Sequence, residues 1–126
     1  MTTQKKIQLY IVDDEPGVCH LIKILFTEFG YEVSEIHNGM ALLETLNKHE
    51  LPDIILLDIM MPEMNGYEVC KIIKSDNKLK KIKVILFTAL PIYAVKDKAE
   101  EAGADAYVTK DIEPEELSRI IMKMLI

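Results

Sequence analysis

Five short apolar runs, each rich in β-forming residues, alternate along the chain with stretches of helical periodicity. This alternation constrains the fold most, because a strand followed by a helix and another strand normally pairs parallel to the next strand through a crossover. In the third run, four consecutive apolar residues stand between Asp53 and Asp58 without any polar alternation. Such a run is typical of a strand buried on both faces. We therefore expect an α/β fold with a mostly parallel sheet covered by helices on both faces, its strands at residues 7–12, 31–36, 54–57, 82–87 and 106–109.

The intervals between these runs carry start and stop signals for helices. Pro16 suits the first turn of a helix, and Gly30 ends that helix. Asn38 can cap a second helix, and Asn65 with Glu68 predicts a capping box at the start of a third. The first helix is expected to bury one face formed by Val18, Leu21, Ile22, Leu25 and Phe29.

The predicted apolar faces differ in strength among the later helices. The third helix is expected to bury Val69, Ile72 and Ile73. The fourth, at residues 92–102, has small candidate core residues, namely Ala94, Val95, Ala99 and Ala102. The fifth begins at Pro114, and its expected inward-facing residues are Leu117, Ile120, Ile121, Met124 and Leu125. We therefore expect the fourth helix to pack least tightly.

Composition excludes several classes of protein. The chain has 126 residues, of which 49% are hydrophobic and 29% charged, and no apolar run approaches the roughly 18 residues that span a bilayer. Its start lacks the apolar stretch and cleavage site of a signal peptide, so we expect a cytoplasmic protein that does not contact membranes. The net charge of −6 argues against nucleic-acid binding by this domain.

Cysteine and histidine do not form metal-site patterns in the sequence. Cys19 and Cys70 each lie inside a helical pattern and are expected to be reduced and buried. His20, His37 and His49 are scattered, which favours surface positions over metal ligation. Sites built from thiolate or imidazole ligands are therefore not expected.

Polar residues stand directly after several of the predicted strands. Asp13 and Asp14 follow the first run, Asp58 the third, Thr88 the fourth and Lys110 the fifth. In a parallel sheet these ends meet at one edge, where ligands bind at the reversal of strand order. Three acids gathered there would repel one another unless a cation lay between them, and carboxylates without nitrogen or sulfur ligands favour Mg²⁺. Taken singly, each residue has an ordinary interpretation: an acidic loop, a turn aspartate, a β-forming threonine or a surface lysine.

Four motifs occur in order along the chain: IVDDE at 11–15, LLDIMMPEMNGYE at 56–68, FTA at 87–89 and GADAYVTK at 103–110. Through these motifs the sequence resembles the receiver domain of bacterial two-component response regulators, typified by the single-domain chemotaxis receiver, over essentially its whole length. The resemblance implies one receiver domain over residues 1–126, with no effector domain among them. It also implies a doubly wound, flavodoxin-like (βα)5 three-layer sandwich whose five-stranded parallel sheet has the order 2-1-3-4-5.

The resemblance further implies a phosphoacceptor site. Asp58 would take a phosphoryl group from the phosphohistidine of a histidine kinase or phosphotransfer protein. The reaction would need Mg²⁺, with Mn²⁺ as a substitute. Asp14 would be a direct metal ligand and Asp13 a ligand through water, Asp58 would also belong to the metal site, and Met60 would supply its backbone carbonyl.

The resemblance assigns the remaining site residues to stabilising and switching roles. Lys110 would pair with Asp58 and then with the phosphoryl oxygens, and the Thr88 hydroxyl would hydrogen-bond to the phosphoryl group. Tyr107 would rotate inward as Thr88 moves, which would change the surface of the fourth helix, fifth strand and fifth helix. That surface would dock a downstream effector domain or target protein, or form a homodimer. The implied protein is a signalling switch that catalyses only its own phosphorylation and slow dephosphorylation.

Two features depart from the usual family pattern. Asp111 follows Lys110 where the family usually has a proline joined by a cis bond. We expect Lys110-Asp111 to be trans, because a non-proline cis bond costs roughly 2.5–4 kcal/mol. Asp111 also adds an acid that would weaken phosphoryl accumulation or point to solvent. Met60 and Leu90, at positions that tune dephosphorylation in the family, are apolar and cannot hydrogen-bond an attacking water, so slow self-dephosphorylation is predicted.

Three other functions compete with the phosphorylation switch. A phosphatase with Asp58 as nucleophile would need a second acid two residues later, where Met60 stands. A flavodoxin-like carrier would need a phosphate loop rich in serine, threonine or glycine, whereas Asp13 and Asp14 would repel a flavin phosphate. A protein-interaction module that keeps the receiver fold but works without phosphorylation stays open because of Asp111.

Overall fold

The computed structural model describes residues 5–126, so residues 1–4 of the predicted domain lie outside the described chain. Its strands are β1 (Gln8–Val12), β2 (Glu32–Ile36), β3 (Ile54–Asp58), β4 (Lys83–Thr88) and β5 (Ala106–Thr109). Its helices are α1 (Pro16–Glu28), α2 (Gly39–Lys48), α3 (Gly66–Ser75), α4 (Ile92–Glu101) and α5 (Pro114–Met124). Strands and helices alternate as predicted, and the strand bounds differ from the predicted ones by at most one residue.

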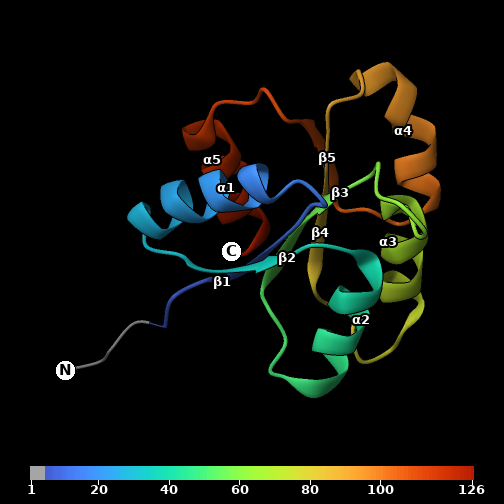
Figure 1. Cartoon of the computed structure of the whole chain (residues 1–126), viewed down its shortest axis with the longest axis horizontal. Coiled ribbons are helices and arrows are strands. Elements are labelled where there is room, and N and C mark those ends of the chain that lie inside the picture. The colour runs from blue at the N-terminus through green and yellow to red at the C-terminus, as the bar shows by residue number, and fades with distance from the viewer. Residues whose placement is uncertain (1–4) are drawn as a thin grey trace.

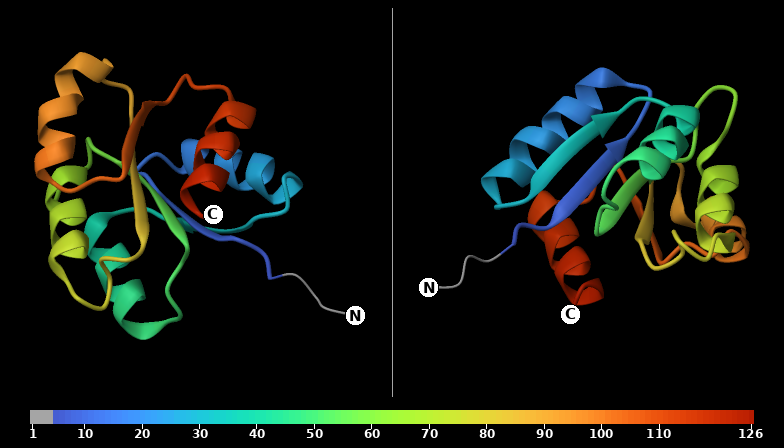
Figure 2. Two further views of the ribbon diagram at one scale, coloured as in Figure 1. Left: turned by 180° about the vertical axis from the view of Figure 1, so that it is seen from behind. Right: turned by 90° about the horizontal axis from the view of Figure 1, so that it is seen from below.

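The five strands form one parallel sheet in the order β2-β1-β3-β4-β5. Helices α1 and α5 cover one face of the sheet, and α2, α3 and α4 cover the other (Figures 1 and 2). The strand order reverses between β1 and β3, which is where such sheets open a ligand crevice at their carboxyl edge. The predicted three-layer sandwich and strand order are confirmed.

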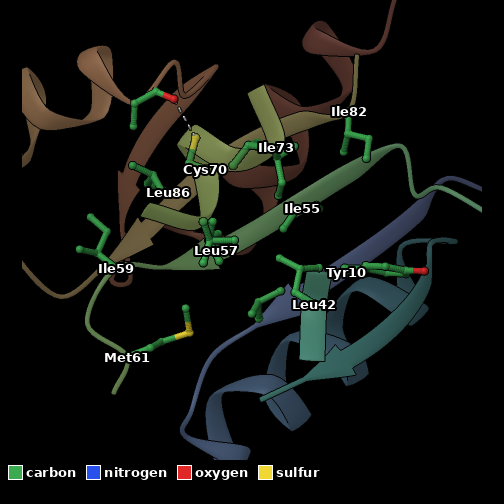
Figure 3. Close-up of a cluster of buried hydrophobic side chains, with 14 of the residues drawn as sticks. Tyr10, Leu42, Ile55, Leu57, Ile59, Met61, Cys70, Ile73, Ile82 and Leu86 are labelled. Atoms are coloured by element: carbon green, nitrogen blue, oxygen red, sulfur yellow. Dashed lines mark hydrogen bonds between the residues drawn. The ribbon is translucent and has the colours of Figure 1, made fainter. Parts of the chain in front are cut away.

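Strand β3 is the centre of the hydrophobic core. Ile54 to Leu57 have no exposed surface, as predicted for a strand covered on both faces. Ile55 and Leu57 point into the cluster under α2, α3 and α4 (Figure 3), whereas Ile54 and Leu56 point into the cluster under α1 and α5. Because each buried aliphatic side chain contributes about 1.5–3 kcal/mol, β3 anchors both helical layers and fixes the place of Asp58 at its end.

Side-chain caps begin two helices where the sequence predicts them. The Asn38 carboxamide oxygen accepts a hydrogen bond from the Ala41 N–H at 2.8 Å. At α3 the capping box is complete, because Asn65 accepts from the Glu68 N–H at 3.0 Å and Glu68 accepts from the Asn65 N–H at 3.1 Å. Such caps stabilise a helix by about 1 kcal/mol each, and the α3 cap fixes the end of the loop that leaves β3.

The apolar face predicted for α1 is confirmed at Val18, Ile22 and Leu25, which contact the core, and wrong at Leu21 and Phe29. The buried residues of α1 are Cys19, Ile22 and Phe26, whereas Leu21 is 57% exposed and Phe29 39% exposed. The helix is apolar on most of its surface, so periodicity alone admits more than one buried face. The aromatic contact of Phe26 with Tyr31, at 5.1 Å between ring centroids, helps select the observed one.

Two smaller corrections concern α3 and α4. Ile72 is 42% exposed, and Cys70 takes a core position in α3 instead. Ala94 is exposed, so α4 buries only Val95 and Ala99 within its bounds. These two side chains are small, which agrees with the weak apolar face that the sequence predicts.

The predictions for cysteine and histidine are confirmed within the described chain. Cys19 and Cys70 are free, fully buried thiols, and burial raises the pKa of each to about 11. The side chain of Cys70 points to the Ala102 carbonyl (Figure 3). All three histidines are exposed. Among the helices of residues 5–126, none has the length and apolar character needed to cross a bilayer.

Candidate functional site

The carboxyl ends of the strands bring residues that are distant in the sequence to one edge of the sheet. Asp58 is the last residue of β3, and Thr88 is the last residue of β4. Asp13 and Asp14 directly follow β1, and Lys110 directly follows β5. The parallel pairing of these strands gathers the polar groups that the sequence singles out.

Three carboxylates form a cluster at this edge. One oxygen each from Asp13, Asp14 and Asp58 lies within 4.8 Å of the other two. Asp13 has no exposed surface and Asp58 is 3% exposed, whereas Asp14 is open to solvent. Carboxylates this close and this buried repel one another strongly in the low dielectric of the protein interior. The cluster therefore has a buried floor and an accessible rim.

Lys110 supplies the positive charge beside the cluster. Its Nζ lies 2.7 Å from Asp13 Oδ2 and 3.3 Å from Asp58 Oδ1. The family resemblance predicts the contact with Asp58 but not the shorter one with Asp13. Nothing in the sequence indicates this preference, because it depends on how far the buried Asp13 side chain turns toward β3 and β5. The N–H of Lys110 donates to the Thr88 carbonyl at 2.7 Å and so ties the two strand ends together.

Within residues 5–126, Asp13 shares its one cationic neighbour with Asp58. Its Oδ1 accepts a hydrogen bond from the Glu15 N–H at 3.0 Å. Its Oδ2 lies 2.7 Å from the Lys110 ammonium, which also serves Asp58. A single ammonium group shared in this way leaves the three carboxylates short of positive charge. The oxygen-only donor set and the accessible Asp14 carboxylate therefore fit a hard divalent cation, and the acidic pocket is a candidate metal site.

Burial and charge shift the pKa values at this site. Burial raises the pKa of Asp58 to about 6, and the charge of Asp13 adds to the rise, while Lys110 opposes it. Burial disfavours the charged form of Lys110, but the two carboxylates outweigh this and raise its pKa. Lys110 thus stays positively charged at neutral pH. One lysine faces three acids, so the site keeps an excess of negative charge.

Thr88 and Tyr107 lie at the neighbouring strands. Thr88 has no exposed surface, and its Oγ1 accepts a hydrogen bond from the Leu90 N–H at 3.0 Å. Its hydroxyl proton is therefore available to another acceptor. Tyr107 is half-buried in β5, and its hydroxyl donates to Glu100 Oε2 of α4 at 3.3 Å. The tyrosine is thus held toward α4.

The loop after β3 passes close to Asp58. The Gly66 N–H donates to the Ile59 carbonyl at 2.9 Å, and a Cβ at Gly66 would lie only 2.9 Å from Ile59 Cα. Gly66 therefore permits close backbone approach. The side chain of Met60 is 64% exposed, whereas that of Met61 is 7% exposed and fills the core.

The loop after β5 contains Asp111, which stands where the family usually has a proline. No cis peptide bond occurs in the described chain, so Lys110-Asp111 is trans, as predicted. Asp111 is exposed, and its carboxylate accepts a hydrogen bond from the Thr109 hydroxyl. A hollow of about 530 Å³ beside Lys110 is lined by Ala89, Leu90, Pro91, Thr109, Lys110 and Asp111.

Comparisons with known proteins match this architecture. The family model of the response regulator receiver domain matches residues 9–122. The polar-differentiation response regulator DivK of Brucella anthropi is 36% identical over 102 residues, which cover 81% of this chain and 82% of DivK. "Probable transcriptional regulator ycf27" of Cyanidium caldarium is 37% identical over 122 residues, which cover 97% of this chain and 47% of that protein. The chain thus spans about half the length of the ycf27 relatives that it matches.

A solved structure agrees with the sequence matches. The BeF3-activated receiver domain of DrrB, a Thermotoga maritima protein, superposes with a TM-score of 0.82 at 31% identity. The match covers 96% of this chain and 98% of that one. Since the family model spans most of the chain and DivK is similar over most of its own length, the chain belongs to the response regulator receiver domain family of two-component systems.

Proposed function

We propose that this chain is a phosphorylation switch in which Asp58 takes a phosphoryl group from the phosphohistidine of a histidine kinase or phosphotransfer protein. One observation carries the proposal. The buried Asp58 carboxylate lies at the carboxyl edge of the sheet, within 4.8 Å of Asp13 and Asp14 oxygens and 3.3 Å from Lys110 Nζ. Receiver domains are signalling switches that interact with histidine kinases and effectors, and this geometry supports the same role here.

The proposed transfer uses charge neutralisation and alignment. A carboxylate oxygen of Asp58 bonds to phosphorus while the bond from phosphorus to the imidazole nitrogen breaks, and the imidazole leaves with that electron pair. Mg²⁺, or Mn²⁺ in its place, would supply positive charge to the phosphoryl oxygens. Asp13, Asp14, Asp58 and the Met60 carbonyl would hold the ion. Lys110 would leave Asp58 for the phosphoryl oxygens, which need neutralisation more than covalent help.

The proposed switch uses Thr88 and Tyr107. A phosphoryl group on Asp58 adds about −1.5 to −2 charge and three acceptor oxygens. The Thr88 hydroxyl proton is available to such an acceptor, and its movement would free space for Tyr107 to turn inward from Glu100. This turn would change the surface of α4, β5 and α5, which would then bind a downstream effector or a second copy. The BeF3-activated form of DrrB is consistent with such a switch in a similar domain.

The phosphorylated form is expected to last. Met60 and Leu90 cannot hydrogen-bond a water that attacks phosphorus, and the Asp111 carboxylate is engaged by Thr109. We therefore expect slow loss of the phosphoryl group after the donor is removed. A phosphorylated half-life of minutes or less would contradict this expectation.

The test is mass spectrometry after incubation with acetyl phosphate and Mg²⁺. The wild-type chain should gain the mass of one phosphoryl group, and EDTA should prevent the gain. Asp58→Asn is the direct test, and Asp111→Asn is the matched control, since it removes an acid in the adjoining loop. The proposal requires loss of the mass gain in Asp58→Asn and its retention in Asp111→Asn.

The same experiment separates the alternative function. If wild type and Asp58→Asn behave alike and Mg²⁺ has no effect, then the phosphorylation switch is wrong. The chain would then be a phosphorylation-independent interaction module with a receiver fold. If another residue carries the added mass, Asp58 loses its assigned role.

A further inference from the structure

The connection from α3 to β4, residues 76–82, forms a basic loop at the amino edge of the sheet, opposite the acidic cluster. Six of the 15 lysine and arginine residues of the chain fall within residues 71–83, where Asp76 is the one acid, although the net charge is −6. Lys78, Lys80 and Lys81 are exposed on the connection from α3 to β4, yellow in Figure 1, and Lys83 follows at half-buried depth. Within the described residues, none of these four lysines has a carboxylate partner within 4.0 Å.

The backbone of the basic loop is fixed by Lys74, which is itself held inward. Lys74 Nζ lies 2.6 Å from Asp105 Oδ2. The same ammonium group donates to the Lys80 carbonyl at 3.0 Å and to the Ile82 carbonyl at 2.7 Å. The loop side chains therefore extend from a backbone that is already ordered.

Asp76, Leu79 and Ile82 also hold the backbone of the basic loop in place. Asp76 Oδ1 accepts from the Lys78 N–H at 2.7 Å, and the Asp76 carbonyl accepts from the Lys80 N–H at 2.8 Å. Leu79 is 5% exposed and Ile82 is 2% exposed, so both anchor the loop in the core. A partner that binds the loop would lose little free energy to ordering it.

A hollow of about 480 Å³ with a mixed polar and apolar lining adjoins the basic loop. Leu51, Pro52, Met124 and Leu125 supply most of its apolar lining, and Lys81 and Lys83 supply its positive charge. Asp53 contributes one carboxylate to the lining, and its Oδ2 accepts a hydrogen bond from the Gln8 N–H at 2.8 Å. The surface thus combines the ammonium groups of the basic loop with a depression that is apolar on the side of Leu51, Pro52, Met124 and Leu125.

We propose that the basic loop and this hollow dock an acidic peptide segment of a partner protein, one in which carboxylates alternate with apolar side chains. The carboxylates pair with Lys78, Lys80 and Lys81, while the apolar side chains enter the hollow. The apolar lining favours a peptide over nucleic acid, whose outer surface is phosphate. The net charge of −6 opposes binding to extended polyanions such as duplex DNA or an anionic bilayer, but a short acidic segment meets only the local charge.

This surface is separate from the phosphoryl site, because one lies at the amino edge of the sheet and the other at the carboxyl edge. A peptide docked there leaves Asp58 accessible. The chain would therefore hold a second partner during phosphorylation, and the two activities can be tested independently.

Fluorescence anisotropy tests the proposal with a labelled peptide in which glutamate and leucine alternate. The peptide should bind saturably to the wild-type chain, with weaker binding at higher salt. Lys80→Glu/Lys81→Glu should weaken binding by about tenfold or more, because each reversal removes an attraction and adds a repulsion. Lys23→Glu/Lys96→Glu is the matched control, since both lysines are exposed on α1 and α4, and it should bind like wild type. Circular dichroism verifies that both double variants fold.

Three further probes complete the test. A polyglutamate peptide of equal charge should bind more weakly than the alternating peptide, because it cannot use the hollow. Duplex DNA and vesicles of phosphatidylcholine and phosphatidylserine should bind more weakly still. No saturable binding of the alternating peptide, equal weakening by the two double variants, or tighter binding of any of these three probes would overturn the proposal. Mass gain from acetyl phosphate should be unchanged in Lys80→Glu/Lys81→Glu, which separates this result from failure of the phosphoryl site.

Discussion

The two edges of the sheet use clustered charge in opposite ways. At the amino edge, Lys74 satisfies its ammonium group with Asp105 and two carbonyls, and Asp105 also accepts from the Val84 N–H at 2.8 Å. At the carboxyl edge, the one ammonium group of Lys110 contacts Asp13 and Asp58, and Asp14 adds a third carboxylate to the cluster. Charged groups whose partners are complete hold a fold in one arrangement, whereas a cluster with an excess of like charge marks a place where a ligand can complete it. The comparison separates the structural edge from the functional edge.

The largest predicted effect is a loss of stability at the amino edge. Lys74→Met keeps the apolar stem but leaves Asp105 and two carbonyls without their shared donor. The free energy of unfolding should fall by about 2–3 kcal/mol, because the ion pair is largely shielded from solvent. Urea denaturation followed by circular dichroism measures the loss. Lys78→Met, at an exposed position, should change stability by less than about 0.5 kcal/mol, and an equal loss in both variants would break the comparison.

The second predicted effect is a gain in the free energy of unfolding, and it concerns the carboxyl edge. The pKa of Asp58 is raised from 3.8 to about 6, so the fold favours the protonated form. Its contribution to stability is therefore present below about pH 4 and is lost as pH rises through about 6. Asp58→Asn keeps the group neutral and should raise the free energy of unfolding by about 1–2 kcal/mol at pH 7 in EDTA. Urea denaturation at pH 7 and pH 4 checks this, because the gain should disappear at pH 4.

Asp105→Asn is the matched control for this carboxylate substitution. It removes a carboxylate charge that forms an ion pair with Lys74, so it should lower the free energy of unfolding at pH 7 rather than raise it. A stability gain in both asparagine variants would mean that the two edges do not differ as described.

The smallest predicted effect tests whether the Tyr107 hydroxyl belongs to the reacting site. Tyr107→Phe removes the exposed hydrogen bond to Glu100 and should lower the free energy of unfolding by about 0.5 kcal/mol or less. Phosphorylation of Asp58 by acetyl phosphate should be unaffected, because the hydroxyl lies toward α4 and away from the carboxylates. Thermal denaturation and mass spectrometry measure the two quantities. Loss of phosphorylation in Tyr107→Phe would place this side chain inside the reacting site.

Sequence reasoning predicts much of this architecture because local signals agree with the global fold. The uninterrupted apolar run before Asp58 indicates the central strand, and the Asn65 capping box indicates the start of α3. The polar residues of the site follow from the rule that parallel strands present their carboxyl ends at one edge. The strand order comes from the family resemblance rather than from the pattern of residues.

Other features depend on three-dimensional packing and leave no local signal. The rotation of α1 cannot be read from a helix that is apolar on most sides, so Leu21 is wrongly placed in the core and Phe26 is missed. The shorter contact of Lys110 with Asp13 and the internal role of Lys74 also have no local signal. In the sequence, Lys74 is one of six lysines in a short segment, and only the fold distinguishes it from its exposed neighbours.

The most direct test of the incomplete carboxyl edge is a Mg²⁺ titration of thermal stability at pH 7. The midpoint of unfolding of the wild-type chain should rise with Mg²⁺ and keep rising with the logarithm of its concentration above the dissociation constant, and the free energy of unfolding should gain about 1.4 kcal/mol at ten times that constant. Asp14→Asn should require more Mg²⁺, since this accessible carboxylate is a proposed ligand. A wild-type midpoint that does not respond to Mg²⁺, or a response that Asp14→Asn and Asp58→Asn share unchanged, would contradict the account.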